Sequence, residues 1–98
     1  MSDFDYQQLN EVIHSRIRLA VMAFLLTVEE AEFNFLKEKV NATDGNLSVH
    51  LKKLEEVGYI SVKKEFVNRK PRTMYKLVEK GRIAFEEYFK TLENMIKK

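Results

Sequence analysis

The hydrophobic positions in the first half of the chain repeat at the spacing of α-helices. After Ser15, a good helix N-cap, apolar residues recur every three or four positions as far as residue 28. A second, shorter helix is predicted to end at Asn41. Residues 5–12 also show helical spacing, and residues 32–34 are predicted to form a very short extended segment. The first half is therefore predicted to be mainly helical.

A further helix is predicted over residues 44–57, directly after a tight turn. Thr43 is placed to cap its start, and Asp44 suits the positive end of its dipole. Gly58 is expected to end it in a left-handed conformation, with Tyr59 packing back on the last turn. The buried seam of this helix is expected to contain Leu47, Leu51, Leu54 and Val57.

The pattern changes to alternation after this helix, which predicts a β-hairpin. Residues 59–66 and 72–77 are the expected strands, and residues 67–71 form a polar, cationic tip. Lys63 and Lys64 point to opposite faces, and Lys64 is the one expected to be structural because it shares a face with the apolar residues of its strand. Residues 79–96 form a final helix whose apolar stripe is too wide for a solvated surface helix.

This order of elements is that of a winged helix-turn-helix domain. The fold class is mainly α with a small β wing (α+β), in a single domain of residues 1–98. The recognition helix is expected at about residues 44–57, the wing at about 60–77 and a dimerisation helix at about 79–96. The N- and C-terminal helices are expected to form the interface of a dimer.

Composition removes several classes of site. The chain of 98 residues contains no cysteine and two histidines, His14 and His50, so neither disulfides nor thiolate metal sites are expected, and no cofactor is predicted. No signal-peptide core and no stretch long enough to span a membrane is found, which predicts a cytoplasmic protein without membrane contact.

Charge is distributed unevenly along the chain. Residues 1–45 carry eight acidic and four basic side chains, whereas residues 46–98 carry seven acidic and thirteen basic ones. Residues 60–82 contain eight basic residues against two acidic ones. Such a cluster favours a polyanion as partner. Solvated strand lysines that guard sheet edges are the alternative explanation.

In a helix-turn-helix domain the second helix enters the major groove of duplex DNA. Asn46 can pair with adenine, Val49 can contact a thymine methyl group, and Lys52 can neutralise a phosphate. The residues expected to bind DNA are Thr43, Asn46, Ser48, Val49, His50, Lys52, Lys53, Arg69, Lys70 and Arg72. For His50, a hydrogen bond within the fold is an equally good expectation.

Residues 43–60, 69–77 and 79–82 together resemble the recognition helix, wing and last-helix entry of MarR/ArsR-like winged-helix transcriptional regulators. The resemblance implies a homodimer on a pseudo-palindromic operator, with Arg69 of each wing at the minor groove and half-sites about 34 Å apart. The implied dimerisation residues are Leu9, Phe85, Tyr88, Phe89, Leu92, Met95 and Ile96. The lack of cysteine argues against metal sensing, and any small-molecule effector stays unassigned.

Two other function classes compete with DNA binding. Ser48 has no histidine and carboxylate placed to activate it, so an enzyme is not expected. Winged-helix domains also serve as protein-protein interaction modules, with the same core and no nucleic acid. Cationic residues on the recognition helix and wing favour double-stranded DNA over this alternative, and over RNA as well, because no stacking platform is evident.

Overall fold

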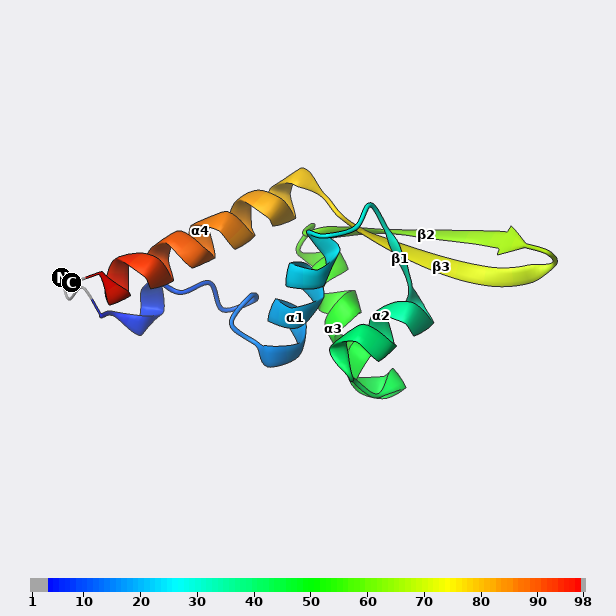
Figure 1. Cartoon of the computed structure of the whole chain (residues 1–98), viewed down its shortest axis with the longest axis horizontal. Coiled ribbons are helices and arrows are strands. Elements are labelled where there is room, and N and C mark those ends of the chain that lie inside the picture. The colour runs from blue at the N-terminus through cyan, green and yellow to red at the C-terminus, as the bar shows by residue number, and fades with distance from the viewer. Residues whose placement is uncertain (1–3, 98) are drawn as a thin grey trace.

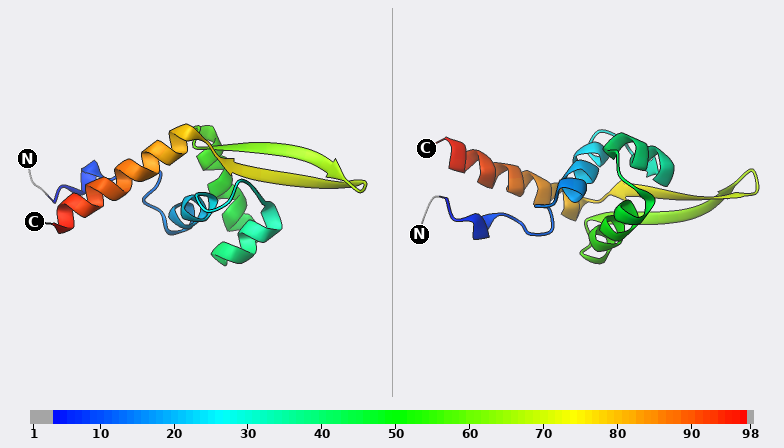
Figure 2. Two further views of the ribbon diagram at one scale, coloured as in Figure 1. Left: turned by 45° about the horizontal axis from the view of Figure 1, so that its top comes forward. Right: turned by 90° about the horizontal axis from the view of Figure 1, so that it is seen from below.

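The computed structural model describes residues 4–97 and is elongated, with extents of 56 × 25 × 21 Å. A helical body lies in the middle, and the last helix and a long β-hairpin extend from it in opposite directions (Figures 1 and 2). In chain order the elements are η1 (Tyr6–Gln8), α1 (Arg16–Leu25), β1 (Ala31–Glu32), α2 (Phe33–Val40), α3 (Asp44–Glu56), β2 (Ile60–Val67), β3 (Lys70–Leu77) and α4 (Glu79–Ile96). The predicted mainly α fold with a small β wing is confirmed.

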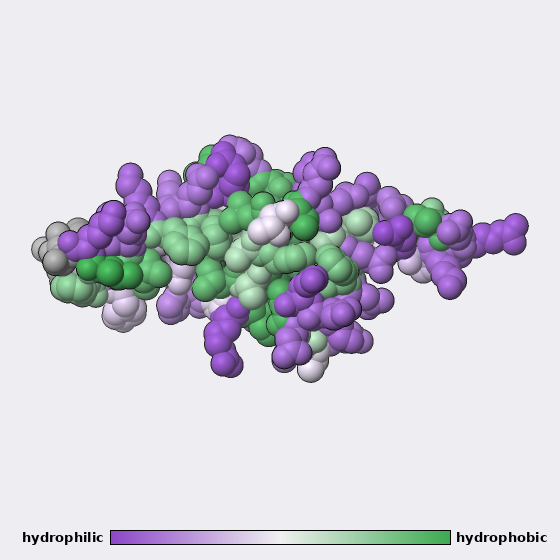
Figure 3. Space-filling model, viewed as in Figure 1, coloured by the Kyte–Doolittle hydropathy of each residue, from purple (hydrophilic) through white to green (hydrophobic). Residues whose placement is uncertain are grey.

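The helices α1, α2 and α3 bury their apolar faces against one another at the centre of the body. Their repeat of three and four residues places these side chains on one face of each helix. The fully or nearly fully buried residues are Val21, Met22 and Leu25 of α1, Leu36 of α2, and Leu47, Leu51 and Leu54 of α3. The predicted leucine seam of α3 is confirmed. The hydrophobic surface visible in Figure 3 is concentrated over this body and towards the chain ends, whereas the far end of the hairpin is mainly hydrophilic.

The helix expected over residues 5–12 is not formed, and η1 is a single 3-10 turn. Asn10 gives the reason, because its Oδ1 accepts hydrogen bonds from the backbone N–H groups of Val12 and Ile13, at 2.9 and 3.2 Å. Such a side chain competes with helical backbone hydrogen bonds. The amide of Asn10 also donates to the hydroxyl of Tyr59 at 2.8 Å, which ties the segment before α1 to the body.

The extended segment lies earlier than expected. It consists of Ala31 and Glu32, which pair with Tyr75 and Met74 of β3, and Phe33 already begins α2. Ala31 is buried in the core, so this pairing fixes the register of the short strand. The prediction of residues 32–34 was therefore misplaced, because two residues suffice for the contact with β3.

Both ends of α3 follow the predicted local signals. The Oγ1 of Thr43 accepts a hydrogen bond from the N–H of Asn46 at 3.2 Å. At the other end Gly58 has a φ of 83°, its N–H donates to the carbonyl of Glu55, and the N–H of Tyr59 donates to Leu54, both at 3.0 Å. This is a Schellman motif. The helix is thus fixed at both termini.

The sheet has the order β1-β3-β2, and β2 and β3 pair from Ile60↔Leu77 to Val67↔Lys70. The predicted tip of five residues was too long, because the strands continue until only Asn68 and Arg69 remain in the turn. Both have positive φ, 53° and 66°, as a type I′ turn requires. Pro71 lies within β3, beyond its pairing with β1, where a sheet edge tolerates a residue without an N–H.

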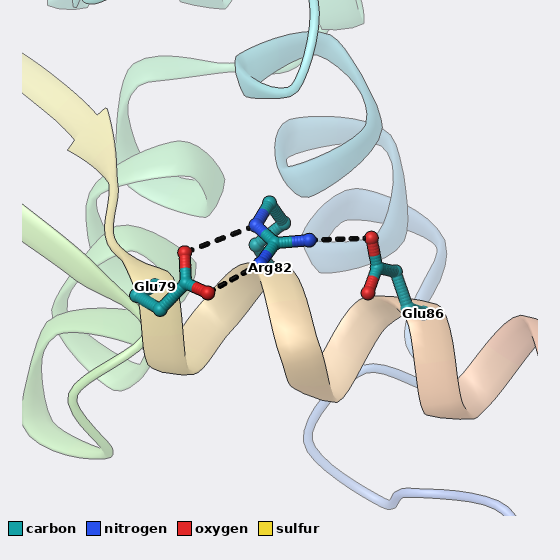
Figure 4. A network of polar contacts seen from close by, with 3 residues as sticks. All are labelled: Glu79, Arg82 and Glu86. Carbon is teal, nitrogen blue, oxygen red and sulfur yellow. Dashed lines mark hydrogen bonds and ion pairs between the residues drawn. The ribbon is translucent and has the colours of Figure 1, made fainter.

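The last helix, α4, begins without a side-chain cap because Val78 occupies the N-cap position. Arg82 instead joins Glu79 and Glu86 along the first turns, with Nε 3.0 Å from Glu79 Oε1 and Nη1 2.6 Å from Glu86 Oε2 (Figure 4). The hydrogen bond from Arg82 lowers the pKa of Glu79. All three side chains are exposed, so this network contributes little to stability.

Gly81 allows α4 to approach the body closely. A Cβ at this position would lie 2.2 Å from the carbonyl oxygen of Tyr59 and 2.9 Å from Leu77 Cδ1. Farther along, Phe85 and Tyr88 pack into the core. Within residues 4–97 no helix is both long and apolar enough to cross a membrane.

Candidate nucleic-acid interface

One face of α3 is turned away from the core and is polar. Because its leucines are buried, the side chains between them are left in solvent, and Val49 among them is 67% exposed. The exposed candidates at the helix start and along this face are Thr43, Asn46, Ser48, Val49, Lys52 and Lys53. Six of the predicted DNA-binding residues therefore lie together on one accessible helix.

The start of α3 also has favourable electrostatics for an anion. The first turn of a helix carries partial positive charge from its free N–H groups. Asp44 opposes this attraction, but the ammonium of Lys37 in α2 lies 2.7 Å from its Oδ1. This ion pair offsets the one carboxylate in the first turn of the helix.

His50 is held by a hydrogen bond within the fold, as one of the two alternatives expected. The Nη1 of Arg18 lies 2.8 Å from His50 Nδ1, and a guanidinium can only donate, so Nδ1 accepts. The same guanidinium donates from Nε to the carbonyl of Val12 at 2.5 Å. Burial and the charge of Arg18 lower the pKa of His50. His50 is thus neutral near pH 7, with its proton on Nε2.

Arg69 and Lys70 are exposed at the free end of the hairpin, where the structure presents them to solvent. Arg69 occupies the left-handed region, which costs a residue with a Cβ about 1–2 kcal/mol relative to glycine. Type I′ turns therefore favour glycine there. Arginine is therefore not the residue that the turn itself favours at this position.

Arg72 differs from the other cationic candidates. Its Nε lies 2.8 Å from Glu32 Oε2, so the two side chains form an ion pair, although the Nε–H group makes no hydrogen bond. Its guanidinium is therefore tied to the body of the domain and is less available to DNA than Arg69 or Lys70.

The neighbouring lysines of β2 reverse the prediction made for them. Both side chains are exposed, but Lys63 lies 3.6 Å from Glu30 and 3.5 Å from Glu65, and Lys64 projects to the opposite face. The reason is that the segment before β1, which carries Glu30, comes close to Lys63. Lys63 is therefore the structural lysine of the pair.

The expected dimerisation residues divide into three groups. Phe85 and Tyr88 are 4% and 6% exposed and belong to the chain's own core, and Tyr88 also has its hydroxyl 2.8 Å from His14 Nδ1. Phe89 and Ile96 are 54% and 76% exposed. Leu9, Leu92 and Met95 are half-buried. Only the last two groups leave apolar surface for a second chain.

An open groove of about 910 Å³ lies between the N-terminal segment and the end of α3, lined among others by Tyr6, Leu9, Val12, His14, Arg18 and Lys53. Its lining mixes cationic, aromatic and aliphatic side chains. In the described part of the chain, no group of three or more histidine, aspartate or glutamate residues could hold a metal ion.

Sequence reasoning did not identify Arg18 and Lys37 as parts of this interface. Both act on α3 from other helices, through His50 and Asp44 respectively. Neither stands near its partner in the sequence, and no local motif links them. Their roles arise from packing and could be found only once the helices were placed.

Residues 17–96 match the family model of the winged helix DNA-binding domain. The chain belongs to this family. An uncharacterized protein of Methanocaldococcus jannaschii is 46% identical to this winged-helix protein over 78 residues, which cover 80% of this chain and 85% of that one. The family makes double-stranded DNA the partner of the chain.

Two solved structures show the same fold. The transcriptional regulator homologue protein from Pyrococcus horikoshii superposes with a TM-score of 0.88 at 26% identity, over 99% of this chain and 96% of that one. A MarR-family transcriptional regulator from Silicibacter pomeroyi gives a TM-score of 0.62 at 20% identity, over 88% of this chain and 55% of that one. The family model confirms the predicted winged helix-turn-helix domain, and both neighbours are named as transcriptional regulators; the second, at 20% identity, shows a shared fold.

Proposed function

We propose that this winged-helix protein is a sequence-specific transcriptional regulator that binds a pseudo-palindromic operator as a homodimer. Each α3 enters a major groove through its exposed face, with Asn46 and Val49 at base edges and Lys52 at phosphate. Each wing tip reaches the neighbouring minor groove, where Arg69 contacts the DNA. The half-sites are then about 34 Å apart.

The observation that carries the proposal is the position of Arg69. It occupies a strained turn at the end of a hairpin that extends from the helical body (Figure 1). A long cationic projection next to an accessible polar helix matches a duplex, whose minor groove lies beside the major groove and is bordered by phosphates.

The exposed apolar side chains of α4 support the homodimer. Phe89 and Ile96 are exposed residues of α4, the helix that extends beyond the body, and the first described residues, drawn in blue, lie near the end of this helix (Figure 1). Burying this surface against a second α4 removes it from water, which is the usual driving force of association.

The first test is titration of a labelled random-sequence duplex at two salt concentrations, with the oligomeric state measured by light scattering. Salt-sensitive binding by a dimer supports the proposal. A folded dimer that fails to bind at low salt contradicts it and favours a protein-interaction module. Binding by a monomer contradicts the homodimer alone.

Two variants test the proposed contacts. Arg69→Ala should weaken binding to all duplexes and reduce the slope of log K against log salt by about one unit for each wing, or about two for the dimer. Asn46→Ala should instead change the preference among operator sequences selected for the wild type. Lys90→Ala removes an exposed charge from α4 and serves as the matched control for the DNA contacts, provided that light scattering shows the same oligomeric state as for the wild type. Unchanged binding in the first two variants would place the interface elsewhere.

A further inference from the structure

A large aromatic side chain is exposed within the cationic end of the hairpin. Phe66 of β2 is 77% exposed, more than any other of the large hydrophobic residues in the described chain. It lies two residues before the turn, and its partner on β3, Pro71, is exposed as well. Hydrophobic residues are visible among hydrophilic ones near this end of the hairpin (Figure 3). The fold therefore gives Phe66 no core to pack against.

The sheet register fixes what surrounds Phe66. Directly paired residues share a face and successive pairs alternate, so Phe66 and Pro71 project to the same side as the pair two positions away, Lys64 and Thr73. The turn adds the charge of Arg69. The nearest carboxylate in sequence, Glu65, points to the opposite face and lies 3.5 Å from Lys63. Phe66 is thus an exposed apolar side chain within a positively charged surface.

Duplex DNA offers a surface of matching chemistry. The walls of the minor groove are formed by deoxyribose rings, which are largely apolar, and phosphates run along both rims. Proteins that enter this groove combine cationic side chains with apolar ones such as phenylalanine and proline. A cationic rim favours this polyanion over an apolar protein surface, which offers no charge to match Lys64 and Arg69.

We propose that Phe66, supported by Pro71, is the apolar contact of the wing with DNA, and that it packs against the minor groove beside the phosphates that Arg69 and Lys64 neutralise. The proposal rests on the proposed function and adds a residue whose contribution is not electrostatic. Its contribution to affinity should therefore be independent of salt, because no counterion is released when an apolar ring is buried.

The test compares Phe66→Ala and Phe66→Leu with the wild type across a salt series, on the full chain and a duplex that the wild type binds. Phe66→Ala should weaken binding about tenfold at every salt concentration and leave the salt slope unchanged. Phe66→Leu, which keeps an apolar side chain and the hairpin pairing, should retain most of the affinity. Tyr6→Ala is the matched control, because Tyr6 is 76% exposed and belongs to η1 rather than to the hairpin; light scattering should show that this variant keeps the oligomeric state of the wild type.

A direct readout comes from Phe66→Trp, since the chain contains no other tryptophan. Adding duplex should change the indole emission and protect it from acrylamide quenching. If Phe66→Ala binds like the wild type and the indole stays accessible in the complex, the proposal is wrong although the proposed function stands. An indole signal that instead follows protein concentration without DNA would assign Phe66 to contact between chains. Absence of DNA binding by the wild type would remove the proposed function and this inference together.

Discussion

Replacing Arg69 by glycine should make the protein more stable and a weaker binder of DNA at the same time. At a φ of 66° the arginine backbone costs about 1–2 kcal/mol that glycine does not incur. Glycine also raises the conformational entropy of the unfolded chain, which offsets about 0.5–1 kcal/mol of this stabilisation. The net stabilisation is then about 0–1.5 kcal/mol, and its central value of about 0.75 kcal/mol raises the melting temperature of a domain of this size by about 3–6 °C.

The loss of the guanidinium acts in the opposite direction on binding. Each charge removed from phosphate should lower the slope of log K against log salt by about 0.9, so the loss of Arg69 from both wings of the proposed dimer lowers it by about 1.8. Thermal melts at a fixed protein concentration and duplex titrations at several salt concentrations measure the two effects on one sample.

Two variants separate strain from charge. Arg69→Ala removes the charge but keeps a Cβ at positive φ, so it should bind as weakly as Arg69→Gly without the gain in stability. Asn68→Gly relieves the other left-handed position, with φ of 53°, and keeps the charge, so DNA binding should be unchanged. An Arg69→Gly protein that melts at or below the wild-type temperature, or that keeps the wild-type salt slope, would refute the reasoning.

Three further predictions concern the elements that hold α3. Gly81→Ala should destabilise the fold by about 2 kcal/mol or more, because the new Cβ meets the backbone of Tyr59. Gly45→Ala should stabilise the fold, because no atom lies within 4 Å of the new Cβ and alanine favours the helix. Denaturant titration compares the two variants, and equal effects on the free energy of unfolding would contradict the close approach of α4 at Gly81. Because the folded pKa of His50 lies below 6.5, the unfolded chain takes up its proton first, so stability should fall as the pH drops below about 6.5. Melting temperatures should then decline more steeply with acidification in the wild type than in His50→Gln, and parallel curves would show that His50 does not contribute. Lys80→Met should cost about 0.5–1 kcal/mol, because the ammonium donates to the carbonyl of Val57 at 2.8 Å, at the end of α3; an unchanged urea midpoint would rule out that contribution.

The features that could be predicted from sequence are those set by neighbouring residues. Thr43 and Gly58 act on the backbone within four positions, so the ends of α3 followed from the sequence. The burial of Phe85 and Tyr88 depends on segments more than seventy residues away, as the contact of Tyr88 with His14 shows. A helical stripe indicates that these side chains are covered but not whether the same chain or a second one covers them.

The same distinction between local and distant effects separates the cationic candidates. The exposure of Arg69 follows from its place in a turn between two alternating strands. Arg72 has the same charge and lies three residues later, yet it is held by Glu32, which the chain brings beside it only through the pairing of β1 with β3. Charge alone therefore could not distinguish an arginine available to DNA from one committed to the fold.

The joint between α3 and α4 has a consequence for the operator. Lys80 bonds to the end of α3, the N–H of Val78 donates to the carbonyl of Tyr59 at 3.1 Å, and Gly81 lies against that same carbonyl. These contacts leave little freedom for α4 to rotate relative to the recognition helix. In a pair of chains joined through α4, the angle and distance between the two recognition helices then follow from how the two α4 helices pack, because the joint within each chain does not adjust them. One extra base pair between the half-sites rotates one half-site by about 34–36° around the duplex axis relative to the other. A stiff joint between α3 and α4 does not let the second recognition helix rotate to match it.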